Sequence, residues 1–252
     1  MEKKGGSHVG FILSFTIFIL FVVFLYVIFS PLNQGRNERE LILSKLNEDI
    51  MRNISSEMTI ITTKISGNPV PPICKYIEIQ TDILNLVSNQ NIRTKNADFK
   101  EIQSAYSVLG FIKIEWNTAW NGNDNKKFLK SYISKRIAHS NYVPSPVNKC
   151  NINLNDYQIV SVDTDNYAFK NNIEELKKEY ENDMEKVKAH FNIPQGVNFW
   201  FNFTDKDKNI NIAPKEINIP KKVNVYLKES SFQYVDNGNA NINRGVLTIK
   251  LW

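Results

Sequence analysis

Acidic and amide side chains between residues 205 and 216 have the spacing in this chain that comes nearest to a metal-binding loop. Asp205, Asp207 and Asn209 supply oxygen atoms at alternate positions, and Glu216 stands at the twelfth position. Calcium loops use this alternation of oxygen ligands and end on a carboxylate at that position. The sixth position holds Ile210 instead of the glycine that the sharp turn needs, and Lys206 and Lys208 inside the loop would repel a cation. We therefore favour a polar hairpin loop over a calcium site, and we predict no cofactor.

The three histidines are too isolated in the sequence to predict a catalytic or metal site. They are His8, His139 and His190, and none has a second ligand or base at a suitable spacing. The chain also lacks a glycine-rich phosphate loop, a Gly-x-Ser-x-Gly turn and a Cys-x-x-Cys pair. We therefore predict that the protein is not an enzyme. The alternative is a membrane-tethered extracytoplasmic hydrolase with a site built from scattered residues, which would require a deep pocket lined by converging titratable groups.

Two cysteines and two asparagines are the remaining candidates for covalent chemistry. Cys74 and Cys150 form an even, low number of cysteines far apart in the sequence, which favours one disulfide in an oxidising compartment. Two buried free thiols are the alternative, because sequence gives no geometry. Asn53 and Asn202 each lie in an Asn-x-Ser/Thr sequence, which permits N-glycosylation outside the cell membrane.

Residues 9–29 form an apolar run that contains no charged side chain. As a helix this run is about 30 Å long, which matches the hydrocarbon core of a bilayer. It is too long for a secretory signal, and no small-x-small cleavage site follows it. We therefore predict a retained membrane anchor within residues 1–35. Lys3 and Lys4 precede the run, which favours a cytoplasmic N-terminus and an extracytoplasmic domain over residues 36–252.

Periodic apolar residues beyond the anchor predict an α+β fold. Residues 36–52 repeat apolar positions every four residues, as in a short helix, and Pro31 and Gly35 would separate this helix from the membrane span. From residue 57 to about residue 163 the period is two, as in Ile112 and Ile114, which is typical of strands buried on one face. Joins rich in Asn, Gly and Pro connect these strands, and we expect an antiparallel sheet.

One long amphipathic helix is expected after this sheet. It would start at Asn171, which with Glu174 resembles a capping box, and end at Pro194. An apolar stripe with helical spacing would pack the helix on a sheet, and its members are Ile173, Leu176, Tyr180, Met184, Val187 and Phe191.

Further strands are expected at the C-terminal end. Phe199, Phe201 and Phe203 would form one buried face, a second strand would cover residues 223–227, and a turn starting at Asp236 would precede the terminal strand. These changes of pattern allow a subdivision into a β-rich part, residues 54–168, and a helix-plus-strand part, residues 169–252.

The charge distribution argues against nucleic acid as a partner. The formal net charge is +5, from 31 basic and 26 acidic residues that are interspersed along the chain. No basic stripe with interleaved aromatic residues marks a nucleic-acid groove, so we expect a solvated surface. The lipid bilayer is the partner that the sequence predicts.

The N-terminus carries a resemblance to a known family. Lys3-Lys4-Gly5-Gly6-Ser7-His8-Val9-Gly10, followed at once by the apolar helix, resembles the class III signal of type IV pilin-like proteins, especially archaeal ones. Residues 245–252 also resemble the end of archaeal proteins that share this N-terminus. The resemblance implies cleavage after Gly5 or Gly6 and a hydrophobic helix retained in the mature protein. The glutamate usual at the fifth mature position of pilins is replaced here, which implies a minor subunit if the chain assembles at all.

We therefore expect a single-pass, N-terminally anchored cell-surface protein with a structural or interaction role. A minor pilin-like subunit is one form of that role, with other pilin-like or surface proteins as partners. An uncleaved signal anchor carrying a binding module is the other form.

Overall fold

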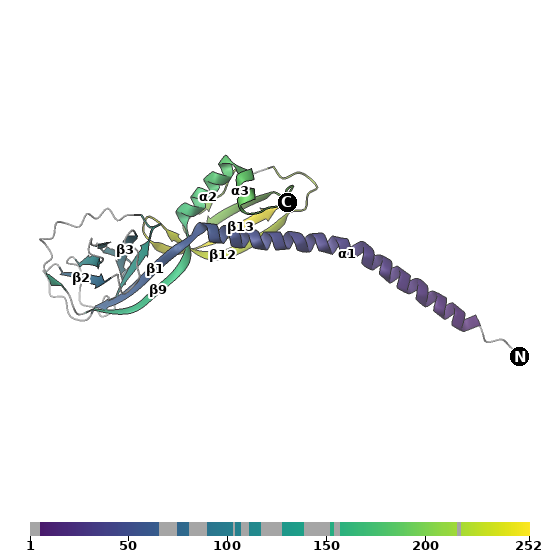
Figure 1. Ribbon diagram of the computed structural model, residues 1–252, viewed down its shortest axis with the longest axis horizontal. Helices are drawn as coiled ribbons and strands as arrows, with labels where there is room; N and C mark the ends of the chain where they lie inside the picture. Colours follow the sequence, from purple (N-terminus) through teal and green to yellow (C-terminus); the bar gives the residue numbers. More distant parts are fainter. Residues whose placement is uncertain are drawn as a thin grey trace.

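One long helix leads into an elongated, β-rich head (Figure 1). The structure is a computed structural model. It describes residues 6–65, 75–80, 90–102, 104–106, 111–116, 128–138, 152–153, 157–215 and 218–252. The predicted α+β class is confirmed, but the prediction of a purely antiparallel sheet was wrong, because two of the strand pairs are parallel.

Helix α1 (Gly6–Ile54) runs for 49 residues, so the prediction of two helices separated at Pro31 and Gly35 was wrong. A proline removes one backbone hydrogen bond and bends a helix, but helix formers on both sides can carry the helix through it. Figure 1 shows α1 curving between its two halves. After Ile54 the chain enters β1 (Ser55–Ile65) without a loop, and the Ser55 hydroxyl donates to the Met51 carbonyl oxygen at 2.6 Å.

Among the described residues, the larger of two sheets contains nine strands in the order β11-β10-β13-β12-β9-β1-β7-β3-β4. Besides β1 these strands are β3 (Asn91–Asn96), β4 (Glu101–Ile102), β7 (Phe128–Ser134), β9 (Tyr157–Phe169), β10 (Phe199–Asp205), β11 (Ile210–Ile212), β12 (Tyr226–Asp236) and β13 (Asn241–Leu251). Strands β12 and β9 are parallel and pair at Tyr234–Ala168 and Val235–Phe169. We call this short pairing of β12 with β9 the seam. It divides the sheet into two halves, β11-β10-β13-β12 and β9-β1-β7-β3-β4, which diverge on either side of it.

A smaller sheet covers the far end of the head. Its order is β5-β6-β2-β8, and its strands are β5 (Ser104–Tyr106), β6 (Phe111–Trp116), β2 (Lys75–Gln80) and β8 (Ile152–Asn153). Ile79, Ile112 and Ile114 are buried and face Ile61 and Ile133 of the larger sheet within one hydrophobic cluster. The period of two in this region therefore produced the one-sided strands that the sequence predicted.

The predicted single helix after the sheet is two helices, α2 (Lys170–Asn182) and α3 (Met184–His190). The break lies at Asp183, whose carboxylate accepts from the Lys186 backbone N–H at 2.9 Å and caps α3. The apolar stripe nevertheless continues across the break, with Val187 and Phe191 buried beside Tyr180. Helix α3 ends at His190, four residues before Pro194.

The predicted capping box at the start of the amphipathic helix is also absent. The N-cap residue of α2 is Phe169, which makes no side-chain capping bond. The backbone N–H of Asn171 instead donates to the side-chain oxygen of Asn237 at 3.0 Å. The cap is therefore supplied by the β12–β13 turn, which is 66 residues away in sequence.

The main core lies between the helices and the C-terminal strands. Leu43, Leu46, Ile50 and Ile54 of α1 pack there with the α2–α3 stripe and with the predicted Phe199, Phe201 and Phe203 face of β10. A hydrogen atom in place of a Cβ at Gly245 makes room for the Phe203 ring, since a Cβ would lie 2.2 Å from it. A third, smaller cluster joins the two halves of the head: Met58, Tyr132, Ile137, Phe169, Val235 and Ala240. The subdivision at residue 168 stays a prediction.

Candidate functional site

The first half of α1 presents an apolar surface that nothing in the described chain covers. The window Gly10–Val27 has a mean hydropathy of 2.7, and none of it is buried. By length and composition it can cross a membrane. The one threonine in it, Thr16, donates its hydroxyl to the Ile12 carbonyl oxygen at 2.9 Å, so this polar group needs no outside partner.

The second half of α1 is built into the head. Its buried residues recur every three or four positions from Leu43 to Ile54, which places them on one side of the helix. Two side-chain bonds tie the exposed flank to β12: Lys228 Nζ donates to Ser44 Oγ at 3.0 Å, and Ser230 Oγ donates to Asn47 Oδ1 at 2.7 Å. The anchor-like segment and the head therefore share one helix that packing holds at its C-terminal end.

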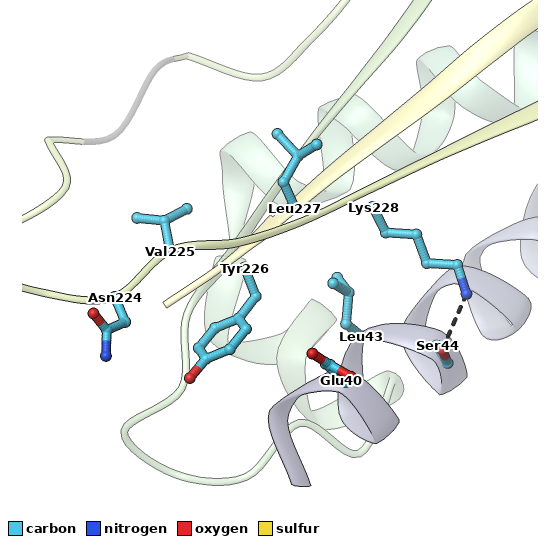
Figure 2. Close-up of a pocket in the computed structure, with 8 residues that line it drawn as sticks. All are labelled: Glu40, Leu43, Ser44, Asn224, Val225, Tyr226, Leu227 and Lys228. Carbon is cyan, nitrogen blue, oxygen red and sulfur yellow. Dashed lines mark hydrogen bonds between the residues drawn. The ribbon is translucent and has the colours of Figure 1, made fainter. Parts of the chain in front are cut away.

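A groove of about 640 Å³ lies where α1 reaches the head (Figure 2). It is lined by Glu40, Leu43, Ser44 and the segment from Asn224 to Lys228. Tyr226 and Lys228 point toward the helix, whereas Val225 and Leu227 point to the other side of the strand. The lining offers one carboxylate, and its lysine is hydrogen-bonded to Ser44. The titratable side chains of this lining are Glu40, Tyr226 and Lys228.

The strand expected over residues 223–227 starts later than predicted. Strand β12 begins at Tyr226, and Val223 and Val225 precede it with 43% of each side chain exposed. A turn at Lys221 and Lys222 precedes these residues, and Lys222 has a φ of 79°, which is not an extended conformation. The strand therefore begins only beyond this turn. Leu227 is in the strand but faces outward and is 55% exposed.

The candidate calcium residues lie at the β10–β11 hairpin. Asp205 ends β10 and is buried; its Oδ1 accepts from the backbone N–H groups of Asp207 and Lys208, and its Oδ2 accepts from the Tyr234 hydroxyl at 2.6 Å. Asp207 and Asn209 are exposed in the turn, and Glu216 lies outside the described residues. The Asp205 carboxylate therefore has structural partners on both oxygens, in the hairpin loop that we favoured.

The other predicted site residues are scattered. Asn53 is exposed at the end of α1, with its Nδ2 3.3 Å from Nε2 of the exposed His190. Asn202 lies half-buried on β10, with its amide oxygen buried and without a hydrogen-bond partner among the described residues. Gly6 is the first residue of α1. The remaining candidates lie outside the described residues: Gly5, Cys74, Cys150 and His139.

Within the described residues, no three His, Cys, Asp or Glu side chains come together as a metal site. The sequence analysis missed a polar cluster at the junction of the two halves of the head. Lys95 of β3 is buried, and its Nζ donates to the side-chain oxygen of Asn241 on β13. No local pattern could have paired these residues, because they are 146 positions apart in the sequence.

Comparison with known proteins identifies no relative: the chain gives no significant match to a family model, to a curated protein or to a solved structure.

Proposed function

We propose that this chain is a membrane-anchored cell-surface protein with a structural or interaction role, and that it acts as a minor pilin-like subunit. The proposal rests on the contrast along α1. One half is apolar and wholly uncovered, and the other half belongs to the core of the head. Apolar surface of this extent is unstable in water, so lipid or other subunits would cover it.

The continuity of α1 supports a subunit more than a simple tether. A tether needs only a membrane span and a linker, whereas assembly requires every head to keep the same direction relative to its span. Helix α1 is about 74 Å long at 1.5 Å per residue and has no loop between its halves. Packing and the two bonds to β12 fix its second half on the head.

The missing glutamate supports a minor role in assembly. Cleavage after Gly5 or Gly6 would leave a charged amine at the membrane face, with Gly10 or Phe11 at the position where pilins usually have glutamate. An unpaired charge is costly to bury within a bundle of apolar helices. The subunit would therefore start or end a filament, or stay single in the membrane, and would not form the bulk of a filament.

Alkaline carbonate extraction of membranes tests the anchor. We expect the protein in the pellet. Replacing Ile19 and Val22 with arginine should release it, because each arginine near the bilayer centre costs about 2.5–3.5 kcal/mol on the insertion scale. Leu41→Arg is the matched control, since Leu41 is exposed beyond the apolar window and this variant should stay in the pellet. Wild-type protein in the supernatant would refute the anchor.

Two further measurements test the subunit role and the side of the membrane. Mass spectrometry of the native N-terminus should find a start at Gly6 or Ser7, and an intact Met1 would leave an ordinary signal anchor. Protease added to intact cells should digest the head. Sheared surface filaments should contain the protein as a trace component, and its presence as the main component would refute the minor role.

A further inference from the structure

A lysine, an asparagine and an aspartate come together where the tip of the β12–β13 hairpin lies on β3 and β7. Lys95 is only 4% exposed, and its Nζ donates to Asn241 Oδ1. Asp236 is the direct cross-strand neighbour of Asn241 in the hairpin. Side chains in such pairs lie on the same face with Cβ atoms about 5 Å apart. The amine, the amide and the carboxylate therefore occupy one small region.

The surroundings of this cluster shield the Lys95 amine from water and lower its pKa. The Tyr132 ring centroid lies 5.3 Å from Nζ, and the junction cluster of Met58, Phe169, Val235 and Ala240 adjoins Tyr132. Burial lowers the pKa of Lys95, and Arg93 lowers it further, while Glu101 and Asp236 act in the opposite direction. A desolvated lysine with a lowered pKa is a nucleophile, which a solvated ammonium is not.

We propose that Lys95 and Asn241 form an intramolecular isopeptide bond that joins β3 to β13, with Asp236 carrying the proton. The Lys95 Nζ lone pair attacks Cγ of Asn241, and the carbonyl oxygen takes up the displaced electron pair. The Nζ–Cγ bond forms and the Cγ–Nδ2 bond breaks. A proton passes from Nζ through the Asp236 carboxyl to Nδ2, which leaves as ammonia. The step is an amide exchange, so it needs no oxidant, reductant or added cofactor.

The position of the bond gives it a structural purpose. The two halves of the large sheet pair through only two residue pairs between β12 and β9. Lys95 on β3 belongs to one half of the sheet, and Asn241 on β13 belongs to the other half. Their contact therefore connects the two halves across the seam. A covalent bond there would hold the halves together under a pulling force or during transient opening of the seam, which suits a protein exposed at a cell surface.

Intact mass spectrometry of the detergent-solubilised full chain under denaturing conditions tests the proposal. After reduction of the cysteines, the expected mass is lower by one ammonia molecule than the sequence mass, which is calculated from the N-terminus that the native chain has. Tryptic digestion should then give a branched peptide that joins residues 94–100, uncleaved after Lys95, to residues 229–244. A linear 229–244 peptide lacking ammonia would instead locate a succinimide at Asn237-Gly238 and would overturn the proposal, as would an intact mass equal to the sequence mass.

Three variants test the role of each group. Lys95→Arg keeps the positive charge and should abolish the mass loss. Asp236→Asn keeps an oxygen that can accept from the Gly238 N–H, as Asp236 Oδ1 does at 3.0 Å, so the circular dichroism of this variant should be unchanged. The variant should prevent or strongly slow the mass loss. Lys130→Arg, on the exposed side chain paired with Lys95 across β3 and β7, is the matched control and should retain the full loss. Mass loss persisting in Lys95→Arg would overturn the assignment of Lys95.

Discussion

Replacing Asn237 with alanine should be among the most damaging single changes at the junction of the head. Its side chain is only 3% exposed, although it lies in the turn between β12 and β13. Its Oδ1 accepts from the Asn171 N–H in the first turn of α2, and its Nδ2 donates to the Arg136 carbonyl oxygen after β7. One amide group therefore connects a turn, a helix start and a strand end.

The expected cost follows from these two bonds. Loss of a side-chain cap at a helix N-terminus costs about 0.5–2 kcal/mol. A buried carbonyl left without its donor costs about 1–3 kcal/mol. Because both losses occur together, we expect the free energy of unfolding to fall by about 2–4 kcal/mol. For a head of this size that corresponds to a decrease of roughly 4–16 °C in the melting temperature.

Urea denaturation and thermal melting of the detergent-solubilised chain, followed by near-ultraviolet circular dichroism, would measure this loss. Asn171→Ala is the matched control, because the Asn171 side chain is exposed and its backbone N–H remains in the variant. This control should change the stability by less than about 0.5 kcal/mol. Asn237→Asp keeps the capping oxygen and loses the donor, and it should fall between the two. Equal losses from Asn171→Ala and Asn237→Ala would refute the assignment of the cap to Asn237.

Three further predictions concern the whole head. Residues 36–252 should fold as a soluble fragment, because they retain the buried half of α1; persistent aggregation with no cooperative melting would contradict this. Cys74 and Cys150 should form a disulfide, so thiol labelling of unfolded, unreduced protein should find no free cysteine, and two labelled thiols would count against it. Burial raises the pKa of Tyr180 and of Tyr234, and Asp205 raises the latter further. Because unfolded tyrosines ionise near pH 10, the stability that these two contribute should be complete below about pH 10 and should fall above it. Urea denaturation midpoints measured across this pH range should show the fall. Replacing either tyrosine with phenylalanine should make the fall smaller.

Patterns confined to neighbouring residues were enough to predict several elements of this protein. The apolar run was predicted from its length and its lack of charge. The one-sided strands around Ile112 and Ile114 and the Phe199–Phe203 alternation were predicted from a repeat of two residues. The stripe from Ile173 to Phe191 was also predicted correctly as a buried face. What failed there was the assumption that one stripe means one helix, because Asp183 caps a second helix without disturbing the spacing.

Sequence alone therefore determined which segments are apolar on one side and which segment is apolar all round, since those properties are local. Only the tertiary structure decided how α1 continues through Pro31, which strands are neighbours, and that Asn237 caps a helix 66 residues away. The same holds for the contact of Lys95 with Asn241. Such contacts depend on how the chain closes long loops around a shared core, and the residues that make them carry no mark in their own neighbourhood of the sequence.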